Sequence, residues 1–175
     1  STLGAAPGFD FRAVPGTSPP IKFDVFPGAP ASTDPATVVF KGNYSVSDPN
    51  DPTVTMNKTG VYYRDLIDAP AGGTGPVLTI ADGATMIPGT GMHFGAVAPP
   101  SAAGRLAVFT GWDDEWSPTV GGIYLAPLNG PTPPLRVLVR IGDRVPGEPA
   151  GPRYRNLGES LSFDGRFVAF WGTWG

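Results

Sequence analysis

The chain has 175 residues, enough for one core of ordinary size or for a few repeats of a larger array. Its 25 Gly and 22 Pro favour either disorder or loop-dense β structure, and the 41% hydrophobic content, with 10 Phe, favours the second. A net charge of −3 argues against nucleic acid and against an anionic membrane as partners. The absence of Cys excludes disulfides and thiolate metal sites, and no apolar run is long enough for membrane insertion.

Strands are expected along the whole chain. Residues 1–22 read as loop with one short strand near residues 9–14, and residues 42–59, rich in Asn, Asp and Pro, read as a long loop with a hairpin of its own as the alternative. The expected strands are residues 37–41, 60–66, 76–81, 94–99, 105–110, 122–126 and 135–141, followed by a strand pair over 160–172. Asp164-Gly165 predicts a two-residue turn in that pair. No long segment has the apolar spacing of a helix, so an all-β protein is expected.

One short apolar strand that ends at a glycine recurs three times. Phe40, Phe109 and Phe170 hold the same place in it, at a spacing of about 60 residues, which suits a large propeller blade. Val14-Pro15-Gly16, Ile87-Pro88-Gly89 and Val145-Pro146-Gly147 close successive units. The expected organisation is the end of a preceding blade (1–22), a blade with an inserted loop at 42–59 (23–91), a complete blade (92–151) and a partial blade (152–175).

The repeat resembles the TolB-type β-propeller family. The residues that match its pattern are Ser162, Asp164, Gly165, Arg166, Ala169 and Phe170 in one half, and Ile123, Tyr124, Leu128 and Gly130 in the other. A bacterial secreted repeat family with recurring Pro-Gly segments is also similar, through Ile141, Gly142, Asp143, Pro146 and Gly147. The resemblance implies β-propeller-like, four-stranded antiparallel blades. It leaves the activity open, because such propellers host binding, scaffolding and enzymatic roles. An extracellular or cell-surface location is expected separately.

About two and a half repeats cannot close a ring. Three arrangements remain open: a fragment of a longer array, several copies joined head to tail, or an open stack of sheets with exposed edges. The fragment is favoured because both ends fall inside a unit. Further blades or copies of the same chain are therefore expected partners, beside protein or carbohydrate.

Aromatic and acidic residues gather after the strand-ending glycines, on loops expected at one rim. The candidate ligand-binding residues are Tyr44, Trp112, Asp113, Asp114, Glu115, Trp116 and Trp174. Flat aromatic faces stack on sugar rings and on partner side chains, and carboxylates accept hydrogen bonds from hydroxyls. The alternative is that these aromatics cap the blade ends and pack on the next blade. Calcium is the one metal that the acidic run would suit, and a solvated turn is the simpler interpretation.

No catalytic set is singled out. His93 is the only His, so paired-His zinc chemistry is excluded, and the Gly-x-Ser-x-Gly signature that would support a Ser-His-Asp triad is absent. The function expected is a non-catalytic binding or structural module of a larger extracellular protein. The alternatives are a lectin-like propeller and a propeller hydrolase or lyase whose active site lies partly in other blades.

Asn43 and Asn57 each begin an N-glycosylation sequon and bracket the segment 42–59. In a secreting eukaryote this segment would be a glycan-bearing surface, which agrees with an extracellular location.

Overall fold

The computed structural model describes residues 13–33, 36–66, 75–148 and 151–175, which form only strands, turns and irregular loops. The first sheet has the order β1 (Ala31–Thr33), β2 (Thr37–Ser47), β3 (Thr55–Asp65) and β4 (Leu78–Asp82). The second has β5 (Ala96–Val97) and β6 (Ser101–Ala103) beside β7 (Leu106–Trp112), then β8 (Gly121–Pro127) and β9 (Arg136–Arg140). The third is the pair β10 (Tyr154–Phe163) and β11 (Val168–Trp174). Every pairing is antiparallel, which confirms the expected all-β, antiparallel architecture.

None of the residues described belongs to a helix that is long and apolar enough to cross a membrane.

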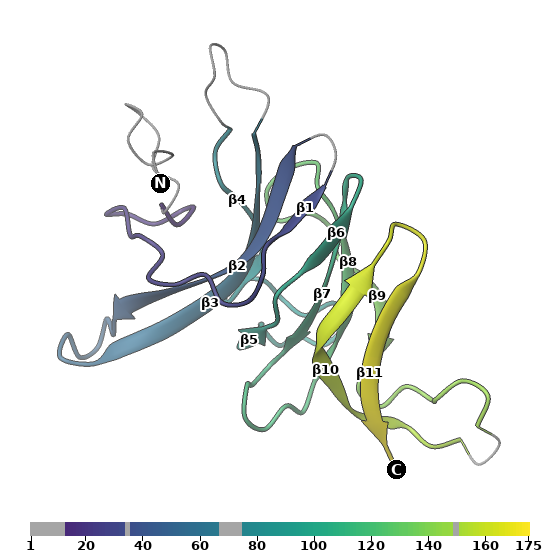
Figure 1. Cartoon of the computed structure of the whole chain (residues 1–175). Helices are drawn as coiled ribbons and strands as arrows, with labels where there is room; N and C mark the ends of the chain where they lie inside the picture. The colour runs from purple at the N-terminus through teal and green to yellow at the C-terminus, as the bar shows by residue number, and fades with distance from the viewer. Residues whose placement is uncertain (1–12, 34–35, 67–74, 149–150) are drawn as a thin grey trace.

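The three sheets follow one another across the molecule, with the β10–β11 pair at one end (Figure 1). Successive residues of a strand point to opposite faces, so the central sheet has two apolar faces. On β7, Ala107 and Phe109 pack against the first sheet, in a cluster that includes Val39 and Val61. Val108, between them, packs against Leu157 of β10. The central sheet is therefore buried on both sides.

The first two sheets each begin with an edge strand that is interrupted. In the second sheet β5 and β6 pair with the same edge of β7, and Pro99 and Pro100 lie between them. In the first sheet the bridge of Val25 to Asn43 and the short β1 flank β2 in the same way, with Pro27 in the gap. Proline cannot donate to a ladder, which explains the two breaks. In the third sheet the pairing of β10 with β11 shifts register instead of breaking.

An aromatic ring covers a strand glycine in the second sheet. Phe94 lies edge-on to Tyr124, with ring centroids 5.1 Å apart, and Phe109 contacts both rings. A methyl group added to Gly111 would lie 2.6 Å from the Phe94 ring, so only glycine fits under it. Gly111 and Phe109 face Gly122 and Tyr124 across the β7–β8 pair.

The first sheet repeats this arrangement. Phe23 lies 4.7 Å from Tyr62 and 5.8 Å from Phe40, centroid to centroid, and its ring is 2.6 Å from a methyl group built on Gly42. Phe40 pairs with Tyr62, and Gly42 pairs with Gly60, across β2 and β3. The two sheets thus share one set of aromatic and glycine positions in the same register.

The third sheet has the part of this set that its two strands can supply. Tyr154 contacts Phe170 with centroids 6.0 Å apart, and its ring lies 3.0 Å from a methyl group built on Gly172. Phe40, Phe109 and Phe170 therefore hold corresponding positions, as the repeat in the sequence predicts, but Phe170 is half-buried whereas the other two are buried.

The Pro-Gly segments form equivalent turns. Gly16, Gly89 and Gly147 have φ values of 74°, 76° and 82°, the left-handed conformation that glycine adopts after proline in a type II turn. In each case the residue before the proline donates its amide to a carbonyl beyond the turn: Val14 to Ile21, Ile87 to Met92 and Val145 to Pro152. The turns at Gly89 and Gly147 lie between successive sheets, and the turn at Gly16 precedes the first sheet.

Two predicted turns differ from the structure. The segment 42–59, predicted as a long loop with a hairpin as the alternative, is a hairpin, because β2 and β3 stay paired out to Ser47 and Thr55. The turn residues cluster only between these two strands. The predicted two-residue turn at Asp164-Gly165 has four residues, since Phe163 pairs with Val168. The carboxylate of Asp164 accepts the amides of Arg166 and Phe167, at 2.8 and 2.7 Å, which stabilises the wider turn. The predicted strand near residues 9–14 falls mainly outside the described residues.

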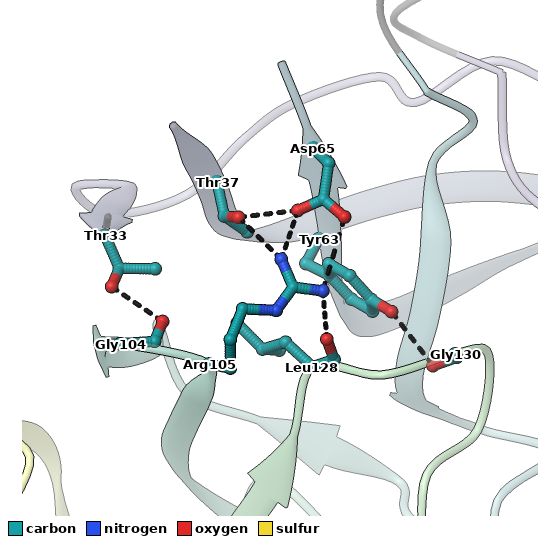
Figure 2. A network of polar contacts seen from close by, with 8 residues as sticks. All are labelled: Thr33, Thr37, Tyr63, Asp65, Gly104, Arg105, Leu128 and Gly130. Carbon is teal, nitrogen blue, oxygen red and sulfur yellow. Dashed lines mark hydrogen bonds and ion pairs between the residues drawn. The ribbon is translucent and has the colours of Figure 1, made fainter. Parts of the chain in front are cut away.

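Arg105 links the first two sheets (Figure 2). Its Nη1 donates to Asp65 Oδ1 at 2.6 Å and to Thr37 Oγ1 at 3.0 Å, and Nη2 donates to the carbonyl of Leu128. The side chain of Arg105 also lies over the ring of Tyr63, 5.9 Å from its centroid. One guanidinium thus contacts both strands of the β2–β3 pair and the chain after β8.

Two further hydrogen bonds join the same sheets (Figure 2). The Thr33 hydroxyl donates to the carbonyl of Gly104 at 2.7 Å, and the Tyr63 hydroxyl donates to the carbonyl of Gly130 at 3.2 Å. These polar contacts set the position of the first sheet on the second, which apolar packing alone leaves free to slide.

The Asp65–Arg105 pair predicts an acid-dependent loss of stability. Partial burial favours a higher pKa for Asp65, but hydrogen bonds from Arg105 and Thr37 outweigh it and lower the pKa below its usual value. The stabilisation of the folded state by the Asp65–Arg105 pair is therefore complete above the unfolded-state pKa of about 4. It is lost as the pH falls through the lower folded-state pKa of Asp65. Urea unfolding of the wild type and of Asp65→Asn should differ by about 1 kcal/mol at pH 6 and converge near pH 2. A difference that persists in acid would contradict this role.

Candidate functional site

A hollow of about 390 Å³ opens where the three sheets meet. Its lining residues are Lys41, Ala96, Val97, Trp112, Glu115, Trp116, Pro118, Asn156, Leu157, Gly158, Glu159, Ser160 and Trp171. We call it the aromatic hollow, because three of the four tryptophans of the chain line it.

Trp171 lies in the hollow because Gly158 leaves room for it. The two residues are on neighbouring strands, and a methyl group on Gly158 would collide with the indole ring. The register of β10 and β11 shifts between Leu157 and Leu161. In this irregular stretch, the carbonyl of Gly158 accepts a buried hydrogen bond from the Thr110 hydroxyl of β7, at 3.0 Å. This hydrogen bond connects Gly158, which lines the hollow, to the central sheet.

The other two tryptophans differ in burial. Trp112 is 8% exposed and packs with Ala96 and Ala98, and its indole N–H is buried without a hydrogen-bond partner among the described residues. Trp116 is 89% exposed, which is unusual for so large an apolar side chain. Trp112 therefore forms a fixed wall, and Trp116 presents an open face.

Two carboxylates of the acidic run shape the loop that carries Trp116. Asp113 accepts the amides of Thr119 and Val120 at 3.0 and 2.9 Å, and Asp114 accepts those of Trp116 and Ser117 at 2.8 and 2.7 Å.

These bonds affect the pKa of one member of the acidic run, Asp113. Partial burial favours a higher pKa for Asp113, but the hydrogen bonds from Thr119 and Val120 outweigh it and lower the pKa. Of the three acidic residues, only Glu115 lines the hollow.

A second hollow of about 300 Å³ adjoins the first, and the two share Lys41, Ala96 and Glu115. We call it the polar hollow; its lining residues are Asp24, Val25, Lys41, Asn43, Tyr44, Ser45, Asn57, Lys58, Thr59, Gly95, Ala96 and Glu115. The Asn43 side-chain oxygen and the Thr59 hydroxyl are buried without a hydrogen-bond partner among the described residues. Together the two hollows make a cleft with one aromatic and one polar half.

The structure brings most of the predicted binding residues to this cleft. Trp112, Glu115 and Trp116 line the aromatic hollow, and Tyr44 lines the polar hollow, where it also packs edge-on to Phe23. Asp113 and Asp114 instead accept hydrogen bonds from main-chain amides of their own loop. Trp174 is 53% exposed but does not line either hollow.

Sequence reasoning missed Lys41, Asn156, Glu159 and Trp171. Lys41 and Trp171 each precede the glycine that ends the recurring strand, at Gly42 and Gly172. This shared position, directly before the glycine, was the feature of the sequence that could have identified both residues. The two sequon asparagines line the polar hollow, with Asn57 exposed and Asn43 half-buried.

Among the described residues, no group of three His, Cys, Asp or Glu side chains lies close enough to hold a metal ion.

Comparison with models of known protein families, with curated proteins and with solved structures found no match for this chain. The function is therefore argued from the cleft and from the repeated sheets.

Proposed function

We propose that the protein is a non-catalytic, carbohydrate-binding module of an extracellular repeat array, with the cleft as its binding site. The observation that carries this proposal is the aromatic hollow, in which indole rings from two different sheets adjoin polar side chains. A pyranose ring has an apolar face of C–H groups and a rim of hydroxyls, so it needs both kinds of contact. Trp116 and Trp171 offer apolar faces, and Lys41, Asn156 and Glu159 offer hydrogen-bonding groups.

The repeated sheets support a β-propeller-like array of the TolB type as the scaffold. The first two sheets share strand order, aromatic register and connecting turns, and the third follows the same pattern in its two strands. Loops at one rim of such an array are common positions for binding residues. Asn57, which is exposed and lines the polar hollow, begins the sequon that a glycosylation enzyme could reach in a secreting eukaryote.

Trp171 and Trp174 form a matched pair for the test. They lie on the same strand and are 55% and 53% exposed, but only Trp171 lines the cleft. A glycan array should identify ligands, and quenching of Trp fluorescence should then give the dissociation constants. We expect Trp171→Ala to weaken binding about tenfold or more, since it removes a stacking surface, and Trp174→Ala to leave binding unchanged. Failure of every glycan to bind would reject the carbohydrate, and equal loss in both variants would reject this cleft.

A second function has one observation in its favour. Glu115 and Glu159 both line the aromatic hollow, and a pair of carboxylates facing a bound sugar is what glycoside cleavage requires. Release of reducing ends from a bound oligosaccharide, abolished in Glu159→Gln, would identify a hydrolase.

A further inference from the structure

Two acidic side chains lie among the tryptophans of the aromatic hollow. Glu115 and Glu159 both line it, and both are exposed. Neither carboxylate has a hydrogen bond or an ion pair with another of the described residues. Their negative charges are therefore available to a ligand in the hollow.

Positive charge is scarce around the same hollow. Among the described residues, Lys41 is the one basic side chain that lines it, and Lys41 also lines the polar hollow, so it lies where the two hollows adjoin. Glu159 and Trp171 line the aromatic hollow and not the polar one. The part of the cleft that these two residues form thus has a carboxylate and an indole ring without a lysine or arginine beside them.

A bulge in the third sheet brings Glu159 to Trp171. Leu157 pairs with Gly172 and Leu161 pairs with Phe170, so residues 158–160 lie opposite Trp171 alone. Such bulges change the direction of side chains and occur often beside binding sites. Here the bulge places the Glu159 carboxylate and the Trp171 ring, which is 55% exposed, in the same hollow.

Trp112 gives an independent indication of a polar ligand. It is 8% exposed and lines the aromatic hollow, and its indole N–H is buried without a hydrogen-bond partner among the described residues. A buried donor that lacks an acceptor destabilises the folded state. A hydroxyl oxygen of a bound ligand would supply the acceptor, so the ligand should carry hydroxyl groups.

An ammonium group uses the remaining features of the hollow together. A cation is attracted to the face of an aromatic ring, and tryptophan is the strongest of the aromatic side chains in this respect. The same cation forms charge-assisted hydrogen bonds with carboxylates. A neutral sugar would stack on the indole rings but would leave the charges of Glu115 and Glu159 unused.

We propose that the aromatic hollow selects sugars that carry a free, protonated amino group, of the glucosamine type. The ammonium group binds the Glu159 carboxylate and the face of Trp171, with Glu115 as a second anion, and the sugar ring stacks on Trp116. This inference rests on the proposed carbohydrate-binding function and names the class of sugar that the cleft prefers.

The test compares three β-1,4-linked oligosaccharides of equal length, built from glucosamine, N-acetylglucosamine or glucose. They differ only in the group at carbon 2, which is an ammonium, an acetamide or a hydroxyl. Quenching of Trp fluorescence gives the dissociation constants. We expect the glucosamine oligomer to bind about tenfold more tightly than the other two, because several exposed electrostatic contacts of modest strength act together. Added sodium chloride should lower this preference, since the carboxylates are exposed to solvent.

Substitutions that change one charge identify the groups responsible. Glu159→Gln and Glu115→Gln should each reduce the preference for the glucosamine oligomer about threefold. Lys41→Gln should increase the preference, because it removes the cation of the hollow, and general damage to the cleft would not have this effect. Glu148→Gln is the matched control. Glu148 is exposed and lines neither hollow, so its variant has the same change in net charge but should keep the preference.

The two proposals for the cleft fail in different ways. Equal affinity for the three oligosaccharides would overturn the selection of an amino group and leave carbohydrate binding intact. A preference that is unchanged in Glu159→Gln and in Glu115→Gln would overturn this place for the ammonium group. If the three oligosaccharides do not bind but a neutral glycan on the array does, the amino sugar is rejected and the carbohydrate function stands. If no glycan of any kind binds, both proposals are rejected.

Discussion

Phe109→Ala is expected to lower the free energy of unfolding by about 3–5 kcal/mol. Phe109 is 0% exposed and lies on the central strand of the central sheet, where its ring contacts Phe94 and Tyr124. Truncation loses the free energy gained by burying the ring, and it leaves a cavity. The two β-sheets cannot move together to fill this cavity, because main-chain hydrogen bonds hold each sheet in place. Denaturant unfolding followed by circular dichroism and by Trp fluorescence measures the change.

Phe167→Ala is the matched control for this prediction. Phe167 is 69% exposed, in the turn between β10 and β11, and the Arg166 guanidinium lies over its ring, 5.6 Å from the centroid. We expect a loss below about 1 kcal/mol. If the two variants were equally stable, the packing of the first sheet on the second would not be the main source of stability.

Gly95→Ala is expected to destabilise the protein by about 1–3 kcal/mol and to abolish ligand binding at the cleft. A methyl group at this position would collide with the main-chain carbonyl of Asp113, and main chain cannot rotate aside as a side chain can. Gly95 also donates its amide to the carbonyl of Trp112 at 2.8 Å. Relief of the collision must therefore move the loop at 113–120, which carries Glu115 and Trp116.

Gly83→Ala separates this effect from a general intolerance of alanine. At Gly83 a methyl group would lie 3.6 Å from the carbonyl oxygen of Phe94, an ordinary contact. This variant should keep both its stability and its binding. Stability is read from urea unfolding, and binding from fluorescence quenching by the glycan found on the array. Gly95→Ala protein that binds normally would contradict the dependence of the cleft on this close approach.

Much of the fold could be predicted because its signals are local. The recurring strand that ends at a glycine marks β2, β7 and β11, and Val/Ile-Pro-Gly marks the turns between sheets. The segment 42–59 was predicted as a long loop, with a hairpin as the alternative, and the structure has the hairpin. The Asn, Asp and Pro residues between its strands favoured the loop, although Tyr44, Val46 and Met56 alternate with polar residues as in a half-buried strand.

The candidate site was only half predictable. Trp112 and Trp116 stand close together in the sequence, beside the acidic run, and this concentration drew attention to them. Trp171 was missed because its place in the cleft depends on Gly158 of the neighbouring strand and on a shift of register. Trp174, a candidate from the sequence, lines neither hollow, because which of Trp171 and Trp174 reaches the cleft depends on which side of β11 faces the loop of the second sheet.

The sequence alone determined that the chain is built of similar antiparallel β units, because strand periodicity, glycine positions and Pro-Gly turns act over a few residues. The tertiary structure alone decided which side chains share a cleft, because Lys41, Trp112 and Trp171 come from three different sheets. Their meeting depends on how the sheets stack, through apolar faces and the contacts of Arg105. Those contacts join residues that are far apart in the sequence, so no pattern within a few residues could predict which of them meet.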